Sequence, residues 1–310
     1  MKKLFALLFL VSCQTRQPEK KAPVGPFILV LGNAQDAGYP QIGCDSACCQ
    51  AYWQGKENKK FPTCLALVNP KAGQYWLFEA TPDIKEQLYG LQAFLPKPDY
   101  SPDGIFLTHA HMGHYTGLMQ LGKEAMNSHD IPVYAMPRMD SFLRNNGPWS
   151  QLVNQNNIQL RNLKADSTIR LNDSFTVKPI RVPHRDEYSE TVGFIISSPN
   201  KKMLFIPDIN KWGQWDRDII SLIKSVDLAL LDGTFYQNGE IPGRDMSQIP
   251  HPFVSESMEL FKNLPPEEKA KIYFIHFNHT NPLLKTEGKE KQDLWNKGFK
   301  MANQGELFNM

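Results

Sequence analysis

Residues 104–114, GIFLTHAHMGH, place three histidines, His109, His111 and His114, directly after a short apolar run. The run at 104–107 is typical of a buried strand, so the three imidazoles fall in the loop where that strand ends. Neutral imidazole is the commonest protein ligand for zinc-like metals. A chance cluster of solvent-facing histidines would rarely follow an apolar strand. We therefore predict a metal site at this strand end.

Three further side chains of the metal-binding type stand at the ends of apolar runs. His184 follows Arg-Val-Pro, Asp208 follows Phe-Ile-Pro, and His276 lies in the run at 272–277. Taken singly, such a histidine is more often structural, and such an aspartate more often forms a turn or caps a helix. All three nevertheless share the position at which α/β folds build their sites. We expect them to meet the histidines of the first loop.

Apolar runs and helical patterns alternate along the rest of the chain. Strands are expected at 27–31, 65–68, 75–78, 104–107, 133–135, 175–182, 192–197, 203–206, 228–231 and 272–277. Helices are expected at 82–94, 114–126, 212–224 and 252–264. Such interleaving predicts a layered α/β fold in which helices cover sheets. Composition does not break anywhere in 27–310, so this region is expected to form one domain.

The N-terminus resembles an export sequence. Residues 1–12, MKKLFALLFLVS, place two lysines before a short apolar run and a small residue before Cys13, as in a secretory signal peptide. The run is shorter than the roughly 20 apolar residues that span a bilayer. The four residues Leu-Val-Ser-Cys at 10–13 resemble a bacterial lipobox. That resemblance implies an exported lipoprotein with its lipid on Cys13, facing the periplasm or cell surface.

The polar, proline-containing residues 13–26 are expected to tether the domain to this anchor. An ordinary signal peptide that happens to contain a cysteine is the alternative.

Charge and composition limit the expected partners. Hydrophobic residues make up 41% of the 310 residues and charged residues 21%, which is ordinary for a globular protein. Lys2 and Lys3 belong to the predicted signal peptide, so the other 32 of the 34 basic residues balance 32 acidic ones. A near-neutral chain without a basic cluster argues against a nucleic-acid partner. A small-molecule substrate is the expected partner, and no pattern indicates an oligomeric state.

The order of the candidate ligands resembles the metallo-β-lactamase superfamily. The pattern is H-x-H-x-x-H, followed by a histidine, an aspartate and a histidine, and the resemblance covers roughly residues 27–310. It implies a four-layer αββα sandwich, with the metal site of a metallo-hydrolase at one edge. It also implies ligand roles: a first metal on His109, His111 and His184, a bridge through Asp208, and a second metal on His114 and His276.

Gly113 departs from the superfamily pattern, which is H-x-H-x-D-H. The acid at that position normally binds the second metal and orients the attacking water, and glycine offers no ligand. Three imidazoles with an open position still suit a hydrolytic zinc site. We therefore expect one or two catalytic zinc ions, with iron or manganese as other possibilities. The expected chemistry is attack by metal-activated water on an ester, amide or phosphodiester, with Asp208 orienting or bridging.

Four segments resemble the group of pyrroloquinoline quinone (PQQ) biosynthesis protein B, PqqB. They are VLGNAQDAGYPQ at 30–41, LDGTF at 231–235, GRDM at 243–246 and HFNHTNP at 276–282. Because they recur in order over most of the chain, they imply a PqqB-like protein. A role in making that cofactor is one alternative to a hydrolase. The others are a metal-binding or ligand-binding lipoprotein without catalysis, an iron-dependent oxidoreductase, and a structural lipoprotein without metal, against which the well-placed histidines argue.

His251 follows the GRDM segment, at 243–246, by five residues. A histidine near this position donates a proton or stabilises charge in phosphodiesterase-like relatives, so His251 is a candidate general acid. A plain loop histidine is the alternative. His129 is expected at the surface.

Cys44, Cys48 and Cys49 cluster within six residues. Clustered cysteines outside the cytoplasm usually form disulfides, and strain in an adjacent pair would make Cys44 the partner. Phosphodiesterase-like relatives instead carry a structural zinc on three cysteines and a histidine, which stands three residues after the last catalytic ligand. That histidine corresponds to His279. The relatives' spacing, C-x-C-x-x-C, differs from C-x-x-x-C-C here, but structural zinc is the favoured interpretation. Cys64 is expected to be buried as a small apolar residue.

Overall fold

The computed structural model describes residues 23–185 and 187–310. The predicted signal peptide, the lipidated Cys13 and tether residues 13–22 lie outside the described residues, so these expectations remain predictions. Residues 23–26, at the end of the predicted tether, form neither helix nor strand. Within the part of the chain that the structure describes, every helix is too short or too polar to cross a bilayer.

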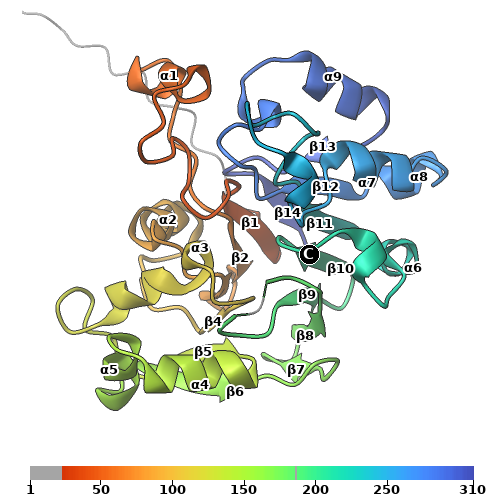
Figure 1. The fold of residues 1–310 in the computed structure, drawn as a ribbon. Coiled ribbons are helices and arrows are strands. Elements are labelled where there is room, and N and C mark those ends of the chain that lie inside the picture. The colour runs from red at the N-terminus through yellow and green to blue at the C-terminus, as the bar shows by residue number, and fades with distance from the viewer. Residues whose placement is uncertain (1–22, 186) are drawn as a thin grey trace, which may run out of the picture.

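Two seven-stranded sheets lie at the centre of the fold (Figure 1). The first has the order β14-β1-β2-β3-β4-β5-β6, with β3 to β6 parallel and the other pairs antiparallel. Its strands are β1 Phe27–Gly32, β2 Cys64–Asn69, β3 Gln74–Phe78, β4 Gly104–Phe106, β5 Ile131–Ala135, β6 Ile158–Asn162 and β14 Leu307–Asn309.

The second sheet has the order β13-β12-β11-β10-β9-β8-β7, and β10 to β13 run parallel. Its strands are β7 Ile169–Arg170, β8 Thr176–Arg181, β9 Val192–Ser197, β10 Lys202–Ile206, β11 Leu228–Asp232, β12 Ile272–Ile275 and β13 Lys300–Met301. The carboxyl ends of parallel strands meet at one edge of a sheet, which is where such folds place ligands.

The α-helices are short and lie mostly outside the sheets. They are α1 Ala47–Trp53, α2 Ile84–Leu91, α3 Met112–Tyr115, α4 Pro137–Asn145, α5 Trp149–Asn154, α6 Ile219–Lys224, α7 Val254–Leu260, α8 Pro266–Lys269 and α9 Lys289–Asn296. Short 3-10 turns follow α2 at Gln92–Phe94 and α3 at Thr116–Leu121. Figure 1 shows α1 at the upper left, apart from both sheets.

Three apolar layers hold the sheets and helices together. The middle layer lies between the sheets and includes Ile28 and Val30 of β1, whereas Phe27 and Leu29 point to the opposite face and pack under α2, α4 and α5. The third layer lies between the second sheet and helices α6, α7 and α9. A strand buried on both faces has apolar residues throughout, as the sequence FILVL of β1 does. The predicted four-layer αββα fold is confirmed.

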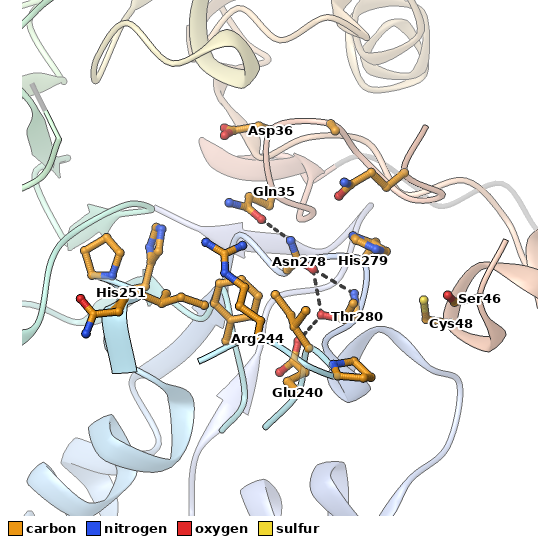
Figure 2. Close-up of a pocket in the computed structure, with 18 of the residues that line it drawn as sticks. Gln35, Asp36, Ser46, Cys48, Glu240, Arg244, His251, Asn278, His279 and Thr280 are labelled. Carbon is orange, nitrogen blue, oxygen red and sulfur yellow. Dashed lines mark hydrogen bonds between the residues drawn. The ribbon is translucent and has the colours of Figure 1, made fainter. Parts of the chain in front are cut away.

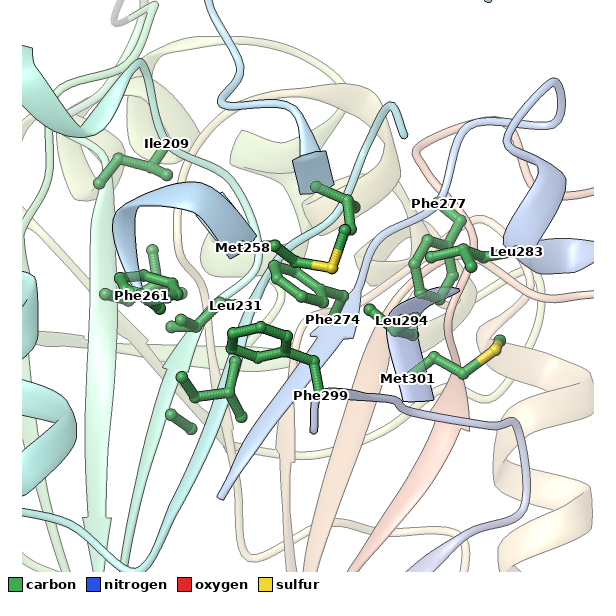
Figure 3. Packing of buried hydrophobic residues seen from close by; sticks show 14 of the residues in the cluster. Ile209, Leu231, Met258, Phe261, Phe274, Phe277, Leu283, Leu294, Phe299 and Met301 are labelled. Carbon is green, nitrogen blue, oxygen red and sulfur yellow. The ribbon is translucent and has the colours of Figure 1, made fainter. Parts of the chain in front are cut away.

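The third layer fixes the strand that leads to His276. Figure 3 shows Phe274 of β12 packed near Met258 of α7 and Phe299. The rings of Phe274 and Phe299 lie 6.3 Å apart, centroid to centroid. Burying a phenylalanine side chain contributes roughly 1.5–3 kcal/mol, so this packing gives the end of β12 a rigid base.

Two of the expected helices differ from the structure. The helix expected at 114–126 is replaced by α3 and a 3-10 turn, and in that turn Gly117, a weak helix former, packs against Thr81, whose carbonyl oxygen would lie 2.0 Å from an added Cβ. The helix expected at 212–224 is broken: α6 begins only after Asp218, which accepts a hydrogen bond from the Ile220 amide. Periodicity indicated helix in both places, but a close glycine contact and a capping aspartate decide the real boundaries.

Candidate metal centre

The predicted ligands come together where the strands of the two sheets end. His109, His111 and His114 follow β4, while His184 follows β8. Asp208 follows β10, and His276 directly follows β12. All six residues lie in two adjoining groups of potential metal-binding atoms. The structure therefore brings the six predicted residues together at one edge of the fold.

The first group consists of His109, His111, His184 and Asp208. Asp208 Oδ2 lies 3.3 Å from His109 Nε2 and 3.2 Å from His184 Nε2. His111 Nδ1 lies 2.8 Å from His109 Nε2 and 3.3 Å from His184 Nε2. A tetrahedral ion with bonds of about 2.1 Å separates its ligand atoms by about 3.4 Å. These spacings fit such an ion.

Hydrogen bonds to Nδ1 turn the Nε2 atoms of two histidines toward this point. Thr108 Oγ1 donates to Glu79 Oε1 at 2.5 Å, so it accepts from His109 Nδ1 at 2.8 Å. His184 Nδ1 lies 3.2 Å from Asn210 Oδ1, an acceptor because the Asn210 amide nitrogen donates to Gln214. Both Nε2 atoms are therefore left with a free lone pair, as metal ligation requires.

Electrostatics keep the first group in a ligating state. Burial lowers the pKa of His109 well below its ordinary value, so its imidazole is neutral. Burial opposes ionisation of Asp208, but its electrostatic interactions with the surrounding imidazoles, His184, His251 and His276, hold its pKa well below the ordinary range. A neutral imidazole beside a carboxylate is the protonation state that metal ligands adopt.

The second group consists of Asp36, His114 and His276. Asp36 Oδ1 lies 3.0 Å from His114 Nε2 and 3.8 Å from His276 Nε2. Asp208 Oδ2, which belongs to the first group, lies 3.9 Å from His114 Nε2 and 4.0 Å from His276 Nε2. One carboxylate oxygen of the first group therefore borders the second group.

Asp36 was not predicted as a site residue, although it lies in the segment 30–41 that carries the family resemblance. It stands four residues after β1, so the rule that ligands follow strand ends would have found it. Glu79, directly after β3, was also missed. Its Oε1 lies 3.1 Å from His114 Nδ1, and it is fully buried. Burial lowers the pKa of His114, but Glu79 and Asp36 outweigh burial and raise that pKa well above its ordinary value. This point of the site therefore favours positive charge.

Glu79 and His276 both have backbones in the left-handed region, with φ of 88° and 69°. That conformation is unfavourable for residues other than glycine and is often found at functional sites. The strain at these two positions is consistent with side chains held in place for ligation rather than for packing.

His251 lies beside the shared carboxylate. Its Nδ1 is 3.1 Å from Asp208 Oδ1 and 2.9 Å from Asp232 Oδ2. Burial lowers the pKa of His251, but the charges of Asp232 and Asp208 outweigh it and raise that pKa to about 10. The predicted general acid is therefore a protonated imidazole at the edge of the metal groups. Asp232, the last residue of β11, was missed by sequence reasoning.

The three clustered cysteines and His279 form a separate group of potential ligands. Cys44 Sγ and Cys48 Sγ lie 3.5 Å apart, and the cysteines of the described chain are free thiols. His279 Nδ1 is buried without a hydrogen-bond partner among the described residues. Burial opposes thiolate formation, but hydrogen bonds from Cys49 and Ser46 lower the pKa of Cys44. Burial raises the pKa of Cys49 to about 12.

A cavity of about 1110 Å³ connects the metal groups with the cysteine cluster. Figure 2 shows His251 and Arg244 toward one end of this cleft, and Ser46 and Cys48 at the other. Asp36 and His279 also line it. His129, in contrast, is at the surface with its side chain 80% exposed, as expected.

Comparison with known proteins identifies the family. Residues 75–277 match the beta-lactamase superfamily domain. The chain belongs to this superfamily, as the histidine pattern indicated, and its strand-end cluster of histidines and aspartates lies at the metal-binding edge of that fold.

Within the superfamily the chain is similar to PqqB proteins. It is 25% identical to coenzyme PQQ synthesis protein B of Pseudomonas putida, over 90% of this chain and 98% of that protein. Its structure is similar to that of Zn2+-bound PqqB from Methylobacterium extorquens, with a TM-score of 0.77 and 20% identity over 92% of this chain and 100% of that one. A diphosphatase of the PhnP family shares the fold at a TM-score of 0.63 and 18% identity, over 92% and 97% of the two chains.

Proposed function

We propose that this protein is a metal-dependent hydrolase whose reaction takes place where the two ligand groups meet. The observation that carries this proposal is the position of Asp208 Oδ2, which lies within 4.0 Å of ligand nitrogens from both groups. One carboxylate oxygen shared by two sets of imidazoles is the arrangement of a bridged two-metal hydrolytic site.

Zinc is the proposed metal. Imidazole nitrogens with one carboxylate are zinc-type ligands, and the PqqB structure from Methylobacterium extorquens is described as Zn2+-bound. When bound at such a site, zinc lowers the pKa of a water molecule and polarises the bond under attack.

The protein's own residues orient the reacting groups. Asp208 contacts both sets of imidazoles and can also accept a hydrogen bond from a nucleophilic water. His251 is held through Nδ1 by Asp208 and Asp232, so its Nε2 is left for the cleft, which His251 lines. We assign to this Nε2–H the delivery of a proton to the leaving group, or stabilisation of its developing negative charge.

The cleft favours a small anionic substrate. Its volume of about 1110 Å³ lies close to the upper end of the roughly 300–1,000 Å³ of small-molecule pockets, and Arg185 and Arg244 both line it. Arg185 Nη2 lies 3.2 Å from His111 Nε2, beside the metal groups. Guanidinium groups bind carboxylates and phosphates through paired hydrogen bonds, so an ester or phosphodiester with an anionic group suits this site best.

We also propose a structural zinc at Cys44, Cys48, Cys49 and His279. The Cys44–Cys48 sulfur separation of 3.5 Å exceeds the roughly 2.05 Å of a disulfide. All four ligand atoms lie within 4.8 Å of one another. Such an ion would tie α1 and its loop to the segment after β12 and so hold one wall of the cleft.

Export with a lipid on Cys13 remains part of this proposal. Labelling of growing cells with a lipid precursor would mark the wild-type protein and leave Cys13→Ser unmarked. An equal label on both would show that the anchor lies elsewhere.

The test of the proposed activity is hydrolysis by purified, zinc-loaded protein. Substrates would be bis-p-nitrophenyl phosphate, p-nitrophenyl acetate and a chromogenic β-lactam. Asp208→Asn should lower the rate by at least about 100-fold, the upper range for losing even an outer partner of a ligand, while His129→Ala should keep it. Turnover that survives metal removal, or none on any substrate by fully loaded protein, would contradict the proposal.

A further inference from the structure

Asp36 occupies the space that a side chain at position 113 would need. A Cβ added to Gly113 would lie 2.3 Å from Asp36 Cα and 2.5 Å from Asp36 Oδ1. Gly113 does not lie in the left-handed region, so its backbone would allow other residues. The contact with Asp36 therefore explains the glycine. At position 113 the superfamily pattern has an aspartate, whereas this chain has a glycine. The space beside that glycine is filled by Asp36, an aspartate from the loop after β1.

The loop that carries Asp36 is fixed to the segment that carries His276. The Gln35 amide donates to the Phe277 carbonyl at 2.8 Å, and the Asn278 amide group donates to Gln35 Oε1 at 2.5 Å. Figure 2 shows Gln35 and Asn278 joined in this way beneath Asp36. The Asp36 carboxylate is thus positioned through Phe277 and Asn278, which directly follow the predicted ligand His276.

The atoms that face Asp36 lack other partners. Asp36 Oδ1, His114 Nε2 and His276 Nε2 are all buried without a hydrogen-bond partner among the described residues. Thr234 Oγ1 donates to Asp232 and so accepts from His276 Nδ1, which leaves a lone pair on His276 Nε2. Unsatisfied buried polar atoms are costly. Three of them converging on one point indicate a site built for a cation.

A simple ion pair between Asp36 and His114 does not explain this arrangement. Their atoms lie 3.0 Å apart but lack hydrogen-bond geometry, and His276 Nε2 is left without a partner. The separations from Asp36 Oδ1 to the two imidazoles, 3.0 and 3.8 Å, bracket the roughly 3.4 Å expected around a tetrahedral ion.

We propose that Asp36 is the acidic ligand of the second metal ion, and that it replaces, from the loop after β1, the aspartate missing at Gly113. His114, His276 and Asp208 complete the site. This proposal rests on the metal-dependent function proposed above, but its test counts ions and needs no substrate. If no hydrolysis is found, the proposed role of Asp36 is unaffected. If only one ion is found in the histidine centre, the role of Asp36 is excluded but a one-metal hydrolase is not.

The experiment counts bound ions in wild type and variants, by plasma mass spectrometry of zinc-loaded protein and by titration with Co2+ in the visible range. Wild type should hold two ions in the histidine centre, besides any ion of the cysteine cluster. Asp36→Asn, which keeps the shape, should weaken the second ion by at least about tenfold, the lower end for losing even an outer partner of a ligand. Gly113→Asp should also lose it, because its Cβ would collide with both the backbone and the carboxylate of Asp36.

Asp36→Asn decides the proposal, and Asp173→Asn, at an exposed aspartate, is the matched control that should keep both ions. Cys48→Ser, measured in parallel, identifies the ion of the cysteine cluster. An unchanged second ion in folded Asp36→Asn, or a wild type with one ion in the histidine centre, would each overturn the proposal.

Discussion

Gly113 and Asp36 are a complementary pair, since the Cα of Asp36 lies 2.3 Å from the position that a Cβ on Gly113 would take. They are 77 residues apart in the sequence and follow different strands: Gly113 lies in α3 after β4, and Asp36 lies in the loop after β1. Because one residue fills the space left by the other, a substitution at either position acts on both. The glycine at position 113 is therefore linked to the loop that carries Asp36, and the absence of an aspartate there is not a simple loss of a ligand.

The first prediction concerns this contact. Gly113→Ala should lower the free energy of unfolding by about 1–3 kcal/mol, the usual cost of overpacking a filled space. Gly90→Ala is the matched control, because Gly90 lies in α2 with open space around its Cα. Alanine there should stabilise the helix by about 0.5–1 kcal/mol. Urea unfolding of both variants measures the difference in free energy. Equal effects would mean that the Asp36 loop moves aside without a cost in stability.

The second prediction concerns the first metal group. His109→Ala removes a buried imidazole whose Nε2 lies 3.3 Å from Asp208 Oδ2. Bound metal in the histidine centre should fall by at least one ion per chain, and any metal-dependent hydrolysis by at least about 100-fold. His129→Ala, at an exposed histidine, should change neither quantity. Plasma mass spectrometry with a rate assay tests this, and full metal content in His109→Ala would exclude His109 as a ligand.

The sequence allowed the central part of this site to be predicted because one physical rule covers it. His109, His184, Asp208 and His276 all stand where apolar strands end, and apolar runs are visible without a structure. Asp36 also follows a strand but was missed, because the superfamily pattern has its acidic ligand at position 113. Its role depends on a distance between two loops, and no spacing along the chain contains that distance.

The fold was predictable to a similar extent. Sheets buried on both faces produce continuous apolar runs, so most of the longer strands were found. The strand β6 was missed, because exposed residues interrupt its apolar pattern. Short helices such as α1, α4 and α5 were also missed, because six to nine residues offer little periodicity. The edge strand β14 was missed for a similar reason, since its three residues pair with β1 across most of the chain length.

The third prediction separates the cysteine cluster from the histidine centre. Cys48→Ser should lower the zinc content by one ion per chain while leaving the histidine centre loaded. Cys64→Ser is the control, because Cys64 is fully buried in an apolar layer and stands outside every candidate metal group of the described residues. It should lower stability by about 1–3 kcal/mol without changing the zinc count. A Cys48→Ser protein with unchanged zinc would favour the disulfide interpretation instead.

The fourth prediction concerns Glu79, which accepts a hydrogen bond from Thr108 and faces His114 Nδ1 at 3.1 Å. Glu79→Gln removes its charge and should weaken the second ion about 10–100-fold, as loss of a carboxylate behind a ligating histidine does. Glu259→Gln, at an exposed position in α7, is the control. Zinc titration of folded protein measures the effect, and unchanged affinity would show that Glu79 only supports the fold.

The last prediction concerns Glu240, which lines the cleft away from the metal ligands. Its carboxylate accepts hydrogen bonds from the Thr280 hydroxyl at 2.5 Å and the Tyr236 amide at 2.7 Å. Burial nevertheless outweighs these bonds and raises the pKa of Glu240 from 4.5 to about 7. Between these two values the folded protein binds more protons at this residue than the unfolded chain does.

Stability must therefore fall as pH rises from about 4.5 to 7, and the contribution of this residue should stay constant above that window. The shift corresponds to at most about 3 kcal/mol, and to less in practice because water reaches part of the side chain. Glu240→Gln should remove this part of the pH dependence, whereas Glu267→Gln, at an exposed site in α8, should keep it. Urea unfolding at pH 5 and pH 8 measures the difference, and a Glu240→Gln protein with the wild-type slope would show that Glu240 ionises as an ordinary carboxylate.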